Sequence, residues 1–533
     1  MLLVLLTRLP LMPQHLYNFD SVNLALAMRE FDPARHQPQP PGYPFFVAES
    51  RLTALLLPDP VQTFHALKIL ISALSLGLLY WTGRELCSER AGLAAAGLLF
   101  VHPVFWYSGL TSPLRLHAAL FSLLVALFCW RALRGRPESF YAASLALGLG
   151  AGFRPTLLLT LLPLWAWCAW STRNGKTILR GAALLAGCCA LWVAPLVWAY
   201  GGLVQTWNSF LGYLLFHSQS AAALAGEPLF QWRRMIGRTV LWNGLGVVPL
   251  FFLAPFAWRA GNGQGRGLPF RFLAVWFLPP FLFNLLVHVG APGHTLTTVP
   301  ALCLAGGMLV DAVSRDKPEG TGARRAGSLW LAALLWSTVI FFWPRAVPQA
   351  APTTAFRGWA SVRDALSIGS YETSYARVRY REQKTADTLS QIRRLKSERD
   401  APVVLIWSGN ETPVWRKLAY YFPSDPVYEL IGAPDRRGLA QAARRWRGNL
   451  LLASYEAAES VRLPVPVGAR LIWILPPREV ERLRQTAPLR SAFPVHYTDL
   501  GPSADSIRLG EFEFYPQEPE SAAAEAGGET TER

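Results

Sequence analysis

Charged residues are scarce for a chain of this length, and the shortage is uneven. They make up 16% of 533 residues, whereas a typical soluble domain carries roughly 25%. Hydrophobic residues make up 52%, and the mean hydropathy is +0.23. The charges gather in short loops and after about Pro344, which leaves a series of apolar runs about 20 residues long, enough to cross a bilayer. The composition predicts a polytopic α-helical membrane protein with one soluble domain at its C-terminal end.

The chain also lacks motifs for metals, disulfides and nucleotides. All six cysteines lie in or beside apolar runs and none follows Cys303, so disulfides cannot stabilise the soluble part. The spacing of Cys and His supports no metal site, and no cofactor is indicated. No GxxxxGK[ST] loop occurs: the glycines of 148–152 indicate close helix packing, and those of 261–267 a flexible loop. These absences argue against a nucleotide-driven pump or a nucleotide-sugar enzyme.

The excess of positive charge has a membrane explanation. The net charge is +16 and the pI is near 9.9, values that in a soluble protein suggest nucleic-acid binding. No basic helix interleaved with aromatic residues is present, however, so no nucleic-acid partner is expected. Lys and Arg gather in the cytoplasmic loops of membrane proteins, which makes the charge a marker of orientation.

The apolar runs predict about 10–11 transmembrane helices, at roughly 60–82, 89–109, 112–133, 139–152, 154–171, 178–200, 238–258, 270–290, 293–313 and 328–344. Basic loops alternate with basic-poor ones only if 139–171 crosses twice. Because Pro155 disfavours helix at Arg154, this stretch is either a hairpin or one broken helix. The segments 8–59, 201–237 and 290–292, and everything after about 345, are then extracytoplasmic. The expected location is a bacterial inner or plasma membrane.

Three regions follow from this pattern. Residues 1–345 form the membrane domain, and because Met1–Leu6 is too short to span, a first helix is expected upstream of this start. Residues 346–516 form a small α/β domain, since β-prone runs at 402–407, 426–431, 449–453, 470–475 and 507–514 are separated by helical stretches such as 381–399 and 435–447. Residues 517–533 form an acidic, disordered tail.

Several polar residues on the predicted outer side are candidates for chemistry. Asp20 precedes a helical stretch at 22–27, so it is either a helix N-cap or a general base, and Asp32 is either a turn residue before Pro33 or a second carboxylate. Arginines on the side where they should be few, among them Arg154, Arg233 and Arg234, suggest a phosphate or anionic headgroup. Most histidines also fall on this side, as site markers or as interfacial residues: His15, His36, His65, His102, His117, His217, His288 and His294.

The first outer loop resembles that of the C-superfamily glycosyltransferases, nearest to the family 39-like enzymes. The similarity rests on Arg8-Leu9-Pro10, Asp20-Ser21 and His36-Gln37-Pro38-Gln39-Pro40-Pro41-Gly42-Tyr43-Pro44. Residues 152–156 and 290–301 resemble later segments of those enzymes. Gln39 stands where the family usually has a His before Pro-Pro. The family includes protein O-mannosyltransferases and aminoarabinose transferases, which use polyprenyl-phosphate sugars and place a catalytic acid early in this loop.

The resemblance implies an integral membrane glycosyltransferase that moves a sugar, hexosyl or mannosyl in type, from a polyprenyl phosphate to an extracytoplasmic protein, lipid or cell-envelope glycan. Asp20, or less strongly Asp32, is the expected base of an inverting displacement. Arg154, Arg233 and Arg234 are expected to bind the donor phosphate. His36, Gln39, Pro41 and Tyr43 form the expected substrate loop. Two alternatives stay open: a lipid-sugar transporter or flippase, and a non-catalytic envelope-binding protein.

Overall fold

The chain folds into two compact units, each described by itself. The structure is a computed structural model that describes residues 1–221, 229–253, 267–287, 291–315, 321–342, 373–409, 411–430, 450–452, 461–501, 506–510 and 512–517. The membrane unit comprises Met1–Gln14 and Asn23–Arg379, and the C-terminal unit comprises His15–Val22 and Tyr380–Arg533. The predicted helix at 435–447, most of the glycine loop at 261–267 and nearly all of the acidic tail lie outside the described residues.

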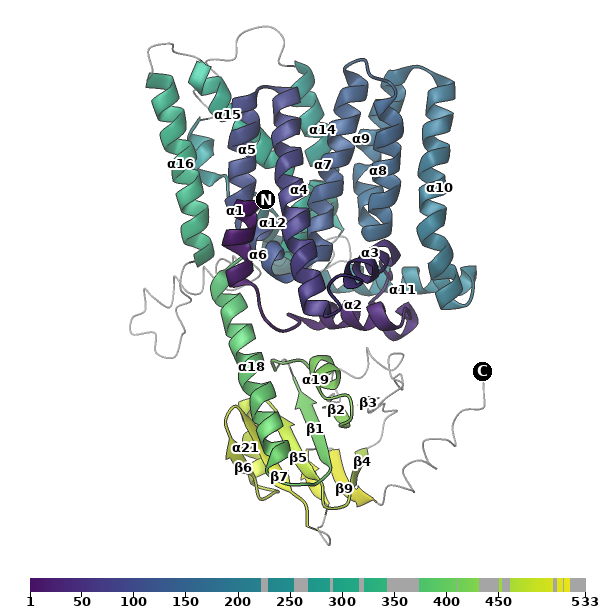
Figure 1. The fold of residues 1–533 in the computed structure, drawn as a ribbon, viewed down its shortest axis with the longest axis vertical. Coiled ribbons are helices and arrows are strands. Elements are labelled where there is room, and N and C mark those ends of the chain that lie inside the picture. Colours follow the sequence, from purple (N-terminus) through teal and green to yellow (C-terminus); the bar gives the residue numbers. More distant parts are fainter. Residues whose placement is uncertain are drawn as a thin grey trace. The chain divides into compact units, whose positions relative to one another are not determined.

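The membrane unit is built from helices (Figure 1). They are α1 (Leu2–Arg8), η1 (Leu9–Leu11), η2 (Pro33–Arg35), α3 (Pro44–Ala54), α4 (Pro60–Leu86), α5 (Glu89–Val101), α6 (Pro103–Thr111), α7 (Pro113–Leu133), α8 (Ser139–Phe153), α9 (Thr156–Thr172), α10 (Gly175–Tyr200), α11 (Leu203–Ala221), α12 (Leu229–Gly244), η4 (Val248–Leu253), α14 (Gly267–Leu286), η5 (Pro292–Thr297), α15 (Val299–Arg315) and α16 (Thr321–Phe342). Two more, α2 (Phe19–Arg29) and α18 (Tyr375–Ser397), run from one unit into the other.

Five of the described helices are long and apolar enough to cross a membrane: α4, α7, α10, α14 and α16. The α5–α6 pair passes the same test as one span bent by 58°, at the point where Pro103 interrupts the predicted run 89–109. The predicted run 238–258 differs from the structure: α12 ends at Gly244 and a 3₁₀ segment follows from Val248. Gly244 and Gly246 lie at and just after the end of α12, and Pro249 is the second residue of the 3₁₀ segment. Glycine and proline both disfavour a continuous helix.

The stretch 139–171 forms a hairpin of two short apolar helices, α8 and α9, rather than one broken helix. Trp165 Nε1 on α9 donates to Ser144 Oγ on α8 at 2.9 Å, which pairs residues equidistant from the turn. The neighbouring glycines act as the sequence suggested, by close packing. A Cβ at Gly148 would lie 2.5 Å from Cys188 Cβ on α10, and one at Gly152 would lie 2.3 Å from the Phe45 ring on α3.

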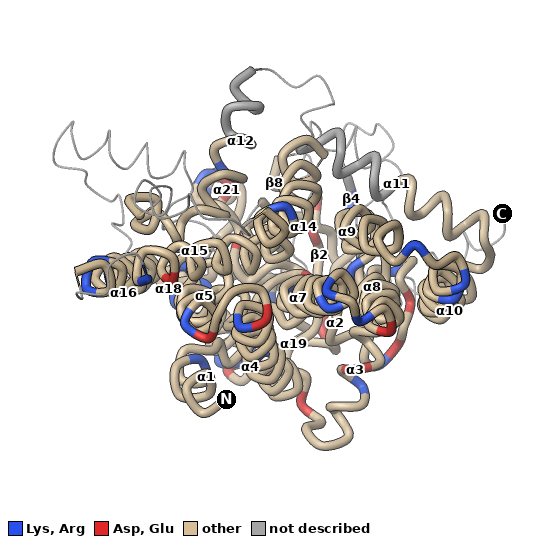
Figure 2. Tube along the Cα trace, turned by 90° about the horizontal axis from the view of Figure 1, so that it is seen from above, with Lys and Arg blue, Asp and Glu red and all other residues tan. Residues whose placement is uncertain are grey.

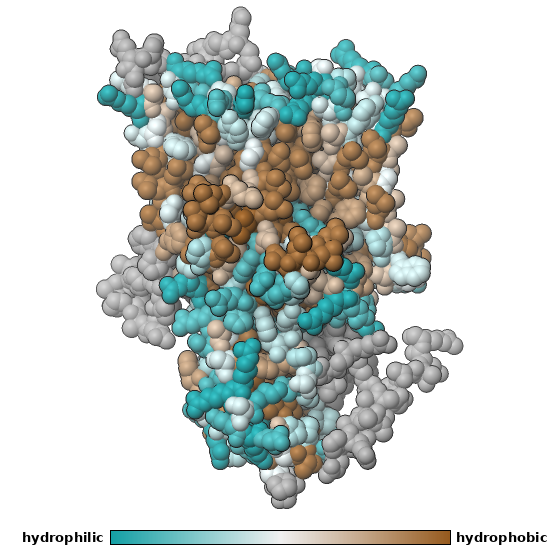
Figure 3. Space-filling view, in the orientation of Figure 1, coloured by the Kyte–Doolittle hydropathy of each residue, from teal (hydrophilic) through white to brown (hydrophobic). Residues whose placement is uncertain are grey.

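All the basic loops with described helix ends lie at one end of the helix bundle. The turns α4–α5, α7–α8, α9–α10 and α15–α16 share that end, as Figure 1 shows, and Lys and Arg mark it in Figure 2. On the face that Figure 3 shows, hydrophobic residues form a band across the helices of this unit, and hydrophilic residues border the band at the basic end. These four turns share one end of the bundle, as the predicted alternation of basic and basic-poor loops requires.

The C-terminal unit contains two β-sheets. The larger has the strand order β3 (Leu450–Leu452), β2 (Val427–Leu430), β1 (Val403–Ser408), β5 (Arg470–Ile474), β7 (Val495–Asp499), β6 (Arg490–Ala492), and the smaller has β4 (Val461–Pro466), β9 (Phe512–Gln517), β8 (Ile507–Leu509). The β3-β2-β1-β5 part is parallel, and β7 and β6 are antiparallel. Helices α18, α19 (Trp415–Tyr421) and α21 (Pro477–Arg484) complete the unit.

The parallel strands read as continuous apolar runs because both faces of the large sheet are covered. On β1, Val404 and Ile406 belong to one buried cluster, and Val403, Leu405 and Trp407 belong to the other. The sequence predicted the largely parallel sheet but not the second, smaller one. The predicted strand 507–514 is instead the β8–β9 hairpin, because Gly510 adopts a positive φ of 60°.

A bidentate ion pair joins β5 to β7. Arg470 Nε lies 2.6 Å from Asp499 Oδ1 and Nη2 lies 3.1 Å from Oδ2, while Nη1 donates to Leu395 O at 2.7 Å. The Arg470 side chain is only 7% exposed. The hydrogen bond from Arg470 is the largest cause of the lowered pKa of Asp499. The stabilisation is therefore present above the pKa of a free Asp and is lost as pH falls through the lower folded-state pKa.

Replacing Asp499 by Asn should destabilise the C-terminal unit by about 3 kcal/mol, because the buried Arg470 charge would lose its bidentate partner and keep only Glu398 at 3.7 Å. Amide hydrogen exchange across β5 and β7 in the full-length protein measures this as faster exchange. Arg490→Ala is the matched control: its guanidinium reaches the same carboxylate at 3.5 Å but is 68% exposed. Its removal should cost less than about 1 kcal/mol. Equal effects of the two substitutions would contradict the role given to the buried pair.

Candidate functional site

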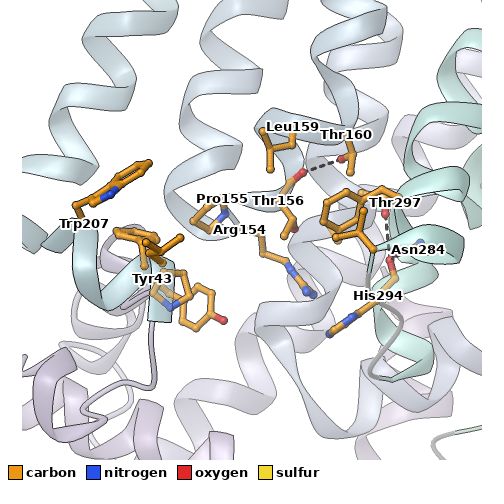
Figure 4. Close-up of a pocket in the computed structure, with 16 residues that line it drawn as sticks. Tyr43, Arg154, Pro155, Thr156, Leu159, Thr160, Trp207, Asn284, His294 and Thr297 are labelled. Carbon is orange, nitrogen blue, oxygen red and sulfur yellow. Dashed lines mark hydrogen bonds between the residues drawn. The ribbon is translucent and has the colours of Figure 1, made fainter. Parts of the chain in front are cut away.

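A cavity of about 290 Å³ opens among helices of the membrane unit (Figure 4). Its walls are mostly apolar, and its polar groups come from three separate parts of the chain. It is lined by Pro41, Tyr43, Ala118, Arg154, Pro155, Thr156, Leu159, Thr160, Trp207, Phe210, Leu211, Phe283, Asn284, Val287, His294 and Thr297. An apolar cavity with a few convergent polar groups is the usual form of a small-molecule site.

Arg154 occupies the turn between α8 and α9. Its backbone is extended (φ −147°, ψ 101°) because Pro155 disfavours helix at the preceding residue, and its N–H donates to Gly150 O at 2.8 Å to close α8. The side chain is half-buried and reaches into the cavity toward the side that carries His294, as Figure 4 shows. The broken helix thus places a guanidinium, a group suited to phosphate, in an otherwise apolar wall.

The facing wall is the 3₁₀ segment η5 with the end of α14. Thr297 Oγ1 donates to His294 O at 3.0 Å, and Asn284 Nδ2 approaches the same carbonyl at 3.5 Å. A Cβ at Gly293 would lie 2.5 Å from Arg115 Cδ, so only glycine allows this arginine to pack against the turn. Arg115, at the start of α7, and Arg154 therefore lie near the same segment.

The predicted substrate loop contributes two residues to the cavity, Pro41 and Tyr43. Between them Gly42 has φ +108°, and a Cβ there would lie 2.4 Å from Leu196 Cδ2 of α10, so glycine is needed for this approach. Tyr43 precedes α3 with φ 42°. His36 and Gln39 are in the same loop but do not line the cavity. Gln39 Oε1 is buried and has no hydrogen-bond partner among the described residues.

Asp20 lies in the C-terminal unit, in the first turn of α2. It is not the N-cap of that helix. Ser21 N donates to Asn18 Oδ1 at 3.0 Å, and Asn18 N donates to Ser21 Oγ at 2.9 Å, which is a reciprocal capping arrangement. The Asp20 carboxylate lies in the first turn of α2, where a negative charge interacts favourably with the positive end of the helix dipole.

Asp32, the weaker candidate, is engaged in a local turn. Its Oδ1 accepts from Arg35 N at 3.2 Å, and its Oδ2 lies 3.1 Å from Arg35 Nε. It caps η2, with Pro33 as the first residue of that segment. These contacts agree with the turn alternative for Asp32.

The remaining candidate residues, the histidines and the arginines of α12, do not form a cluster among the described residues. Among the described histidines, only His294 lines the cavity. His65 Nε2 lies 3.0 Å from Pro13 O, and His102 Nε2 lies 3.3 Å from Asn243 O. Arg233 and Arg234 are in α12, but their side chains lie outside the described part of the structure. No group of three metal-ligating side chains was found among the described residues.

Comparison with known proteins bears on the fold. Residues 38–198, which contain most of the substrate loop and Arg154, match the family described as dolichyl-phosphate-mannose-protein mannosyltransferase. The chain also matches the crystal structure of ArnT from Cupriavidus metallidurans bound to undecaprenyl phosphate, with a TM-score of 0.58 and 14% identity over 94% of this chain and 97% of that one. The chain therefore shares the fold of that ArnT structure.

The structure of the same ArnT in the apo state matches this chain with a TM-score of 0.56 and 15% identity, again over 94% of this chain and 97% of that one. No curated protein matches the chain in sequence. The resemblance inferred from the first loop is confirmed at the level of the fold. The individual site residues stay predictions.

Several cavity residues were missed in the sequence. Trp207, Phe210 and Phe283 belong to apolar segments in which nothing distinguishes a lining residue from a lipid-facing one. Asn284 did carry a signal, because it is a lone amide in an apolar run, and intramembrane polar residues are often functional.

Proposed function

We propose that this protein is an integral membrane glycosyltransferase that moves a sugar from a polyprenyl phosphate to an extracytoplasmic hydroxyl acceptor with inversion. The observation that carries the proposal is the cavity in which Arg154 and His294 meet a largely apolar wall. A lipid phosphate needs both surfaces: apolar side chains for the prenyl chain and a cation for the phosphate. The C-superfamily fold and the match at residues 38–198 support the same class of donor.

The proposed reaction requires a general base for the acceptor hydroxyl and a cation that binds the leaving phosphate. The acceptor oxygen attacks the anomeric carbon and gives its proton to the Asp20 carboxylate. The bond between the anomeric carbon and the phosphate oxygen breaks, and its electron pair stays on the polyprenyl phosphate. Arg154 stabilises the charge that develops on this leaving group. A single displacement inverts the anomeric centre.

The test is transfer in reconstituted membranes. Purified protein in proteoliposomes receives radiolabelled undecaprenyl-phosphate hexoses or pentoses, with a cell-envelope extract as acceptor. The expected result is labelled product of inverted anomeric configuration, and release of undecaprenyl phosphate in equal amount. Movement of labelled donor across the bilayer without any product would instead support the flippase.

The transporter alternative predicts paired charges near the middle of the bilayer. Within the described membrane unit, the pairs Glu85–Arg131 (3.0 Å) and Asp311–Arg315 (2.9 Å) lie at the basic-loop ends of their helices. The His117–Glu49 pair (2.9 Å) joins α7 near its first turn to α3. These positions do not resemble a midplane ion pathway, so the enzyme is the better proposal.

The proposal requires the first loop and the C-terminal domain to be extracytoplasmic. In right-side-out vesicles, an impermeant maleimide should label Leu56→Cys and Ser491→Cys but not native Cys87, all of which are exposed positions. Cys87 lies in a basic loop and serves as the inside reference after permeabilisation. Peptide mass spectrometry separates the three sites. Labelling of Leu56→Cys and Ser491→Cys from opposite sides would contradict this topology.

A further inference from the structure

The segment His15–Val22, which carries Asp20, folds as part of the C-terminal unit rather than with the helices that follow it. Leu16 and Tyr17 are 2% and 5% exposed, although they belong to a loop between short helices. Burial of this degree in a loop requires specific partners. Two helices of the C-terminal unit, α18 and α19, supply them.

Two residues of α19 bind the backbone of the segment. Lys417 Nζ donates to Tyr17 O at 3.2 Å and to Thr385 Oγ1 of α18 at 3.2 Å. Leu16 N donates to the Tyr421 hydroxyl at 3.0 Å. Backbone contacts fix the course of the chain whatever its side chains are. They act directly before the turn that carries Asp20.

Side chains hold the segment from both helices. The Phe19 ring meets the Trp415 ring edge-to-face at 5.7 Å, and the Arg416 guanidinium lies 5.6 Å from the Phe19 centroid. At the other end His15 Nδ1 lies 2.7 Å from Glu382 Oε1 on α18, and the His15 and Tyr421 rings meet edge-to-face at 5.6 Å. Phe19, immediately before Asp20, is thus packed against the same hydrophobic cluster as the β1 strand.

Burying the Lys417 ammonium costs desolvation free energy, which its hydrogen bonds must offset. It is 2% exposed, and burial lowers its pKa to about 7, with Glu382 opposing that shift and Arg381 adding to it. Arg416 is equally buried, and burial lowers its pKa to about 9. A lysine at an ordinary surface position would avoid this desolvation. In the C-terminal unit the ammonium instead lies between α18 and the Asp20 segment.

We infer that the C-terminal domain acts in catalysis by positioning the Asp20 carboxylate, and that Lys417 on α19 is the principal positioning residue. The inference rests on the proposed role of Asp20 as base. Lys417 touches neither donor nor acceptor in this scheme. It fixes Tyr17 O, and through it the start of α2, so that the carboxylate is held in one place. A base misplaced by about 1 Å can lose on the order of 10²-fold in rate.

The test compares Lys417→Met, Lys417→Gln and Tyr421→Phe in the full-length protein, with Lys396→Met as the matched control. Lys396 is a lysine of the same unit whose partner is Asp425, outside the Asp20 segment. Lys417→Met should increase amide hydrogen exchange over residues 16–22 by about 10-fold or more. It should lower kcat by about 10- to 100-fold with little change in KM for an undecaprenyl-phosphate sugar.

Lys417→Gln keeps a donor and should restore part of both effects, whereas Lys396→Met should change neither. Tyr421→Phe removes only the acceptor of Leu16 N, so it tests the segment if Lys417→Met does not fold. Unchanged exchange in Lys417→Met and Tyr421→Phe would overturn the inference, and so would faster exchange with normal kcat. If Asp20→Asn retains normal transfer, the base assignment fails instead, and the exchange data alone then describe a structural contact.

Discussion

Replacing Asp20 by Asn is expected to lower the transfer rate by about 10²- to 10⁴-fold while the protein stays folded and inserted. An amide of the same shape cannot take the acceptor proton. The fold should tolerate the change, because Asn18 and Ser21, not Asp20, make the reciprocal hydrogen bonds that begin α2. The measurement is the initial rate of sugar transfer in proteoliposomes, with protein amount and helix content matched to wild type.

Asp32→Asn is the control for this substitution, since it removes a carboxylate of the same loop region that already binds Arg35. We expect a change in rate of less than about 10-fold, below the usual contribution of a general base. A wild-type rate in Asp20→Asn would rule out the base assignment. A loss confined to Asp32→Asn would transfer the role to that residue.

Replacing Arg154 by Ala is expected to raise KM for the polyprenyl-phosphate donor by about 10- to 100-fold. A hydrogen bond to a charged group is worth about 1.5–3 kcal/mol, and a factor of ten corresponds to about 1.4 kcal/mol. Arg154→Lys keeps the charge but loses the two-pronged geometry, so it should recover only part of the affinity. Affinity for the acceptor should change little in either variant.

Undecaprenyl phosphate without a sugar gives a direct measurement of the same contact. Trp207 lines the cavity with Arg154, and because the chain has 21 Trp, binding is read as the lipid-induced fluorescence change that is absent in Trp207→Phe. Arg134→Ala is the matched control, because Arg134 ends α7 at the basic-loop end of the bundle, outside the cavity. Normal donor affinity in both Arg154→Ala and the Arg233→Ala/Arg234→Ala variant would show that these arginines are structural.

Local sequence patterns were sufficient to predict which segments form most of the helices and strands, and in which order. Hydrophobic run length predicted most of the long helices of the membrane unit, although not the bounds of α12. Continuous apolar runs predicted β1, β2, β3 and β5, because these features depend on burial along a single segment. Pro155 next to Arg154 predicted an interruption, but not whether the two halves would fold back on each other. That outcome depends on packing between α8 and α9, including the Trp165–Ser144 hydrogen bond.

The sequence by itself determined the fold class, a membrane bundle with an α/β domain. It also predicted the chemical types of the site residues, an early carboxylate and arginines on the basic-poor side. Only the tertiary structure decided that Arg154, Tyr43 and His294 share one cavity, and that the segment around Asp20 folds with α18 and α19. Both arrangements bring together residues that are far apart in the chain. Hydropathy and turn propensity act over a few neighbouring residues, whereas such contacts arise from packing of whole helices, which no local pattern encodes.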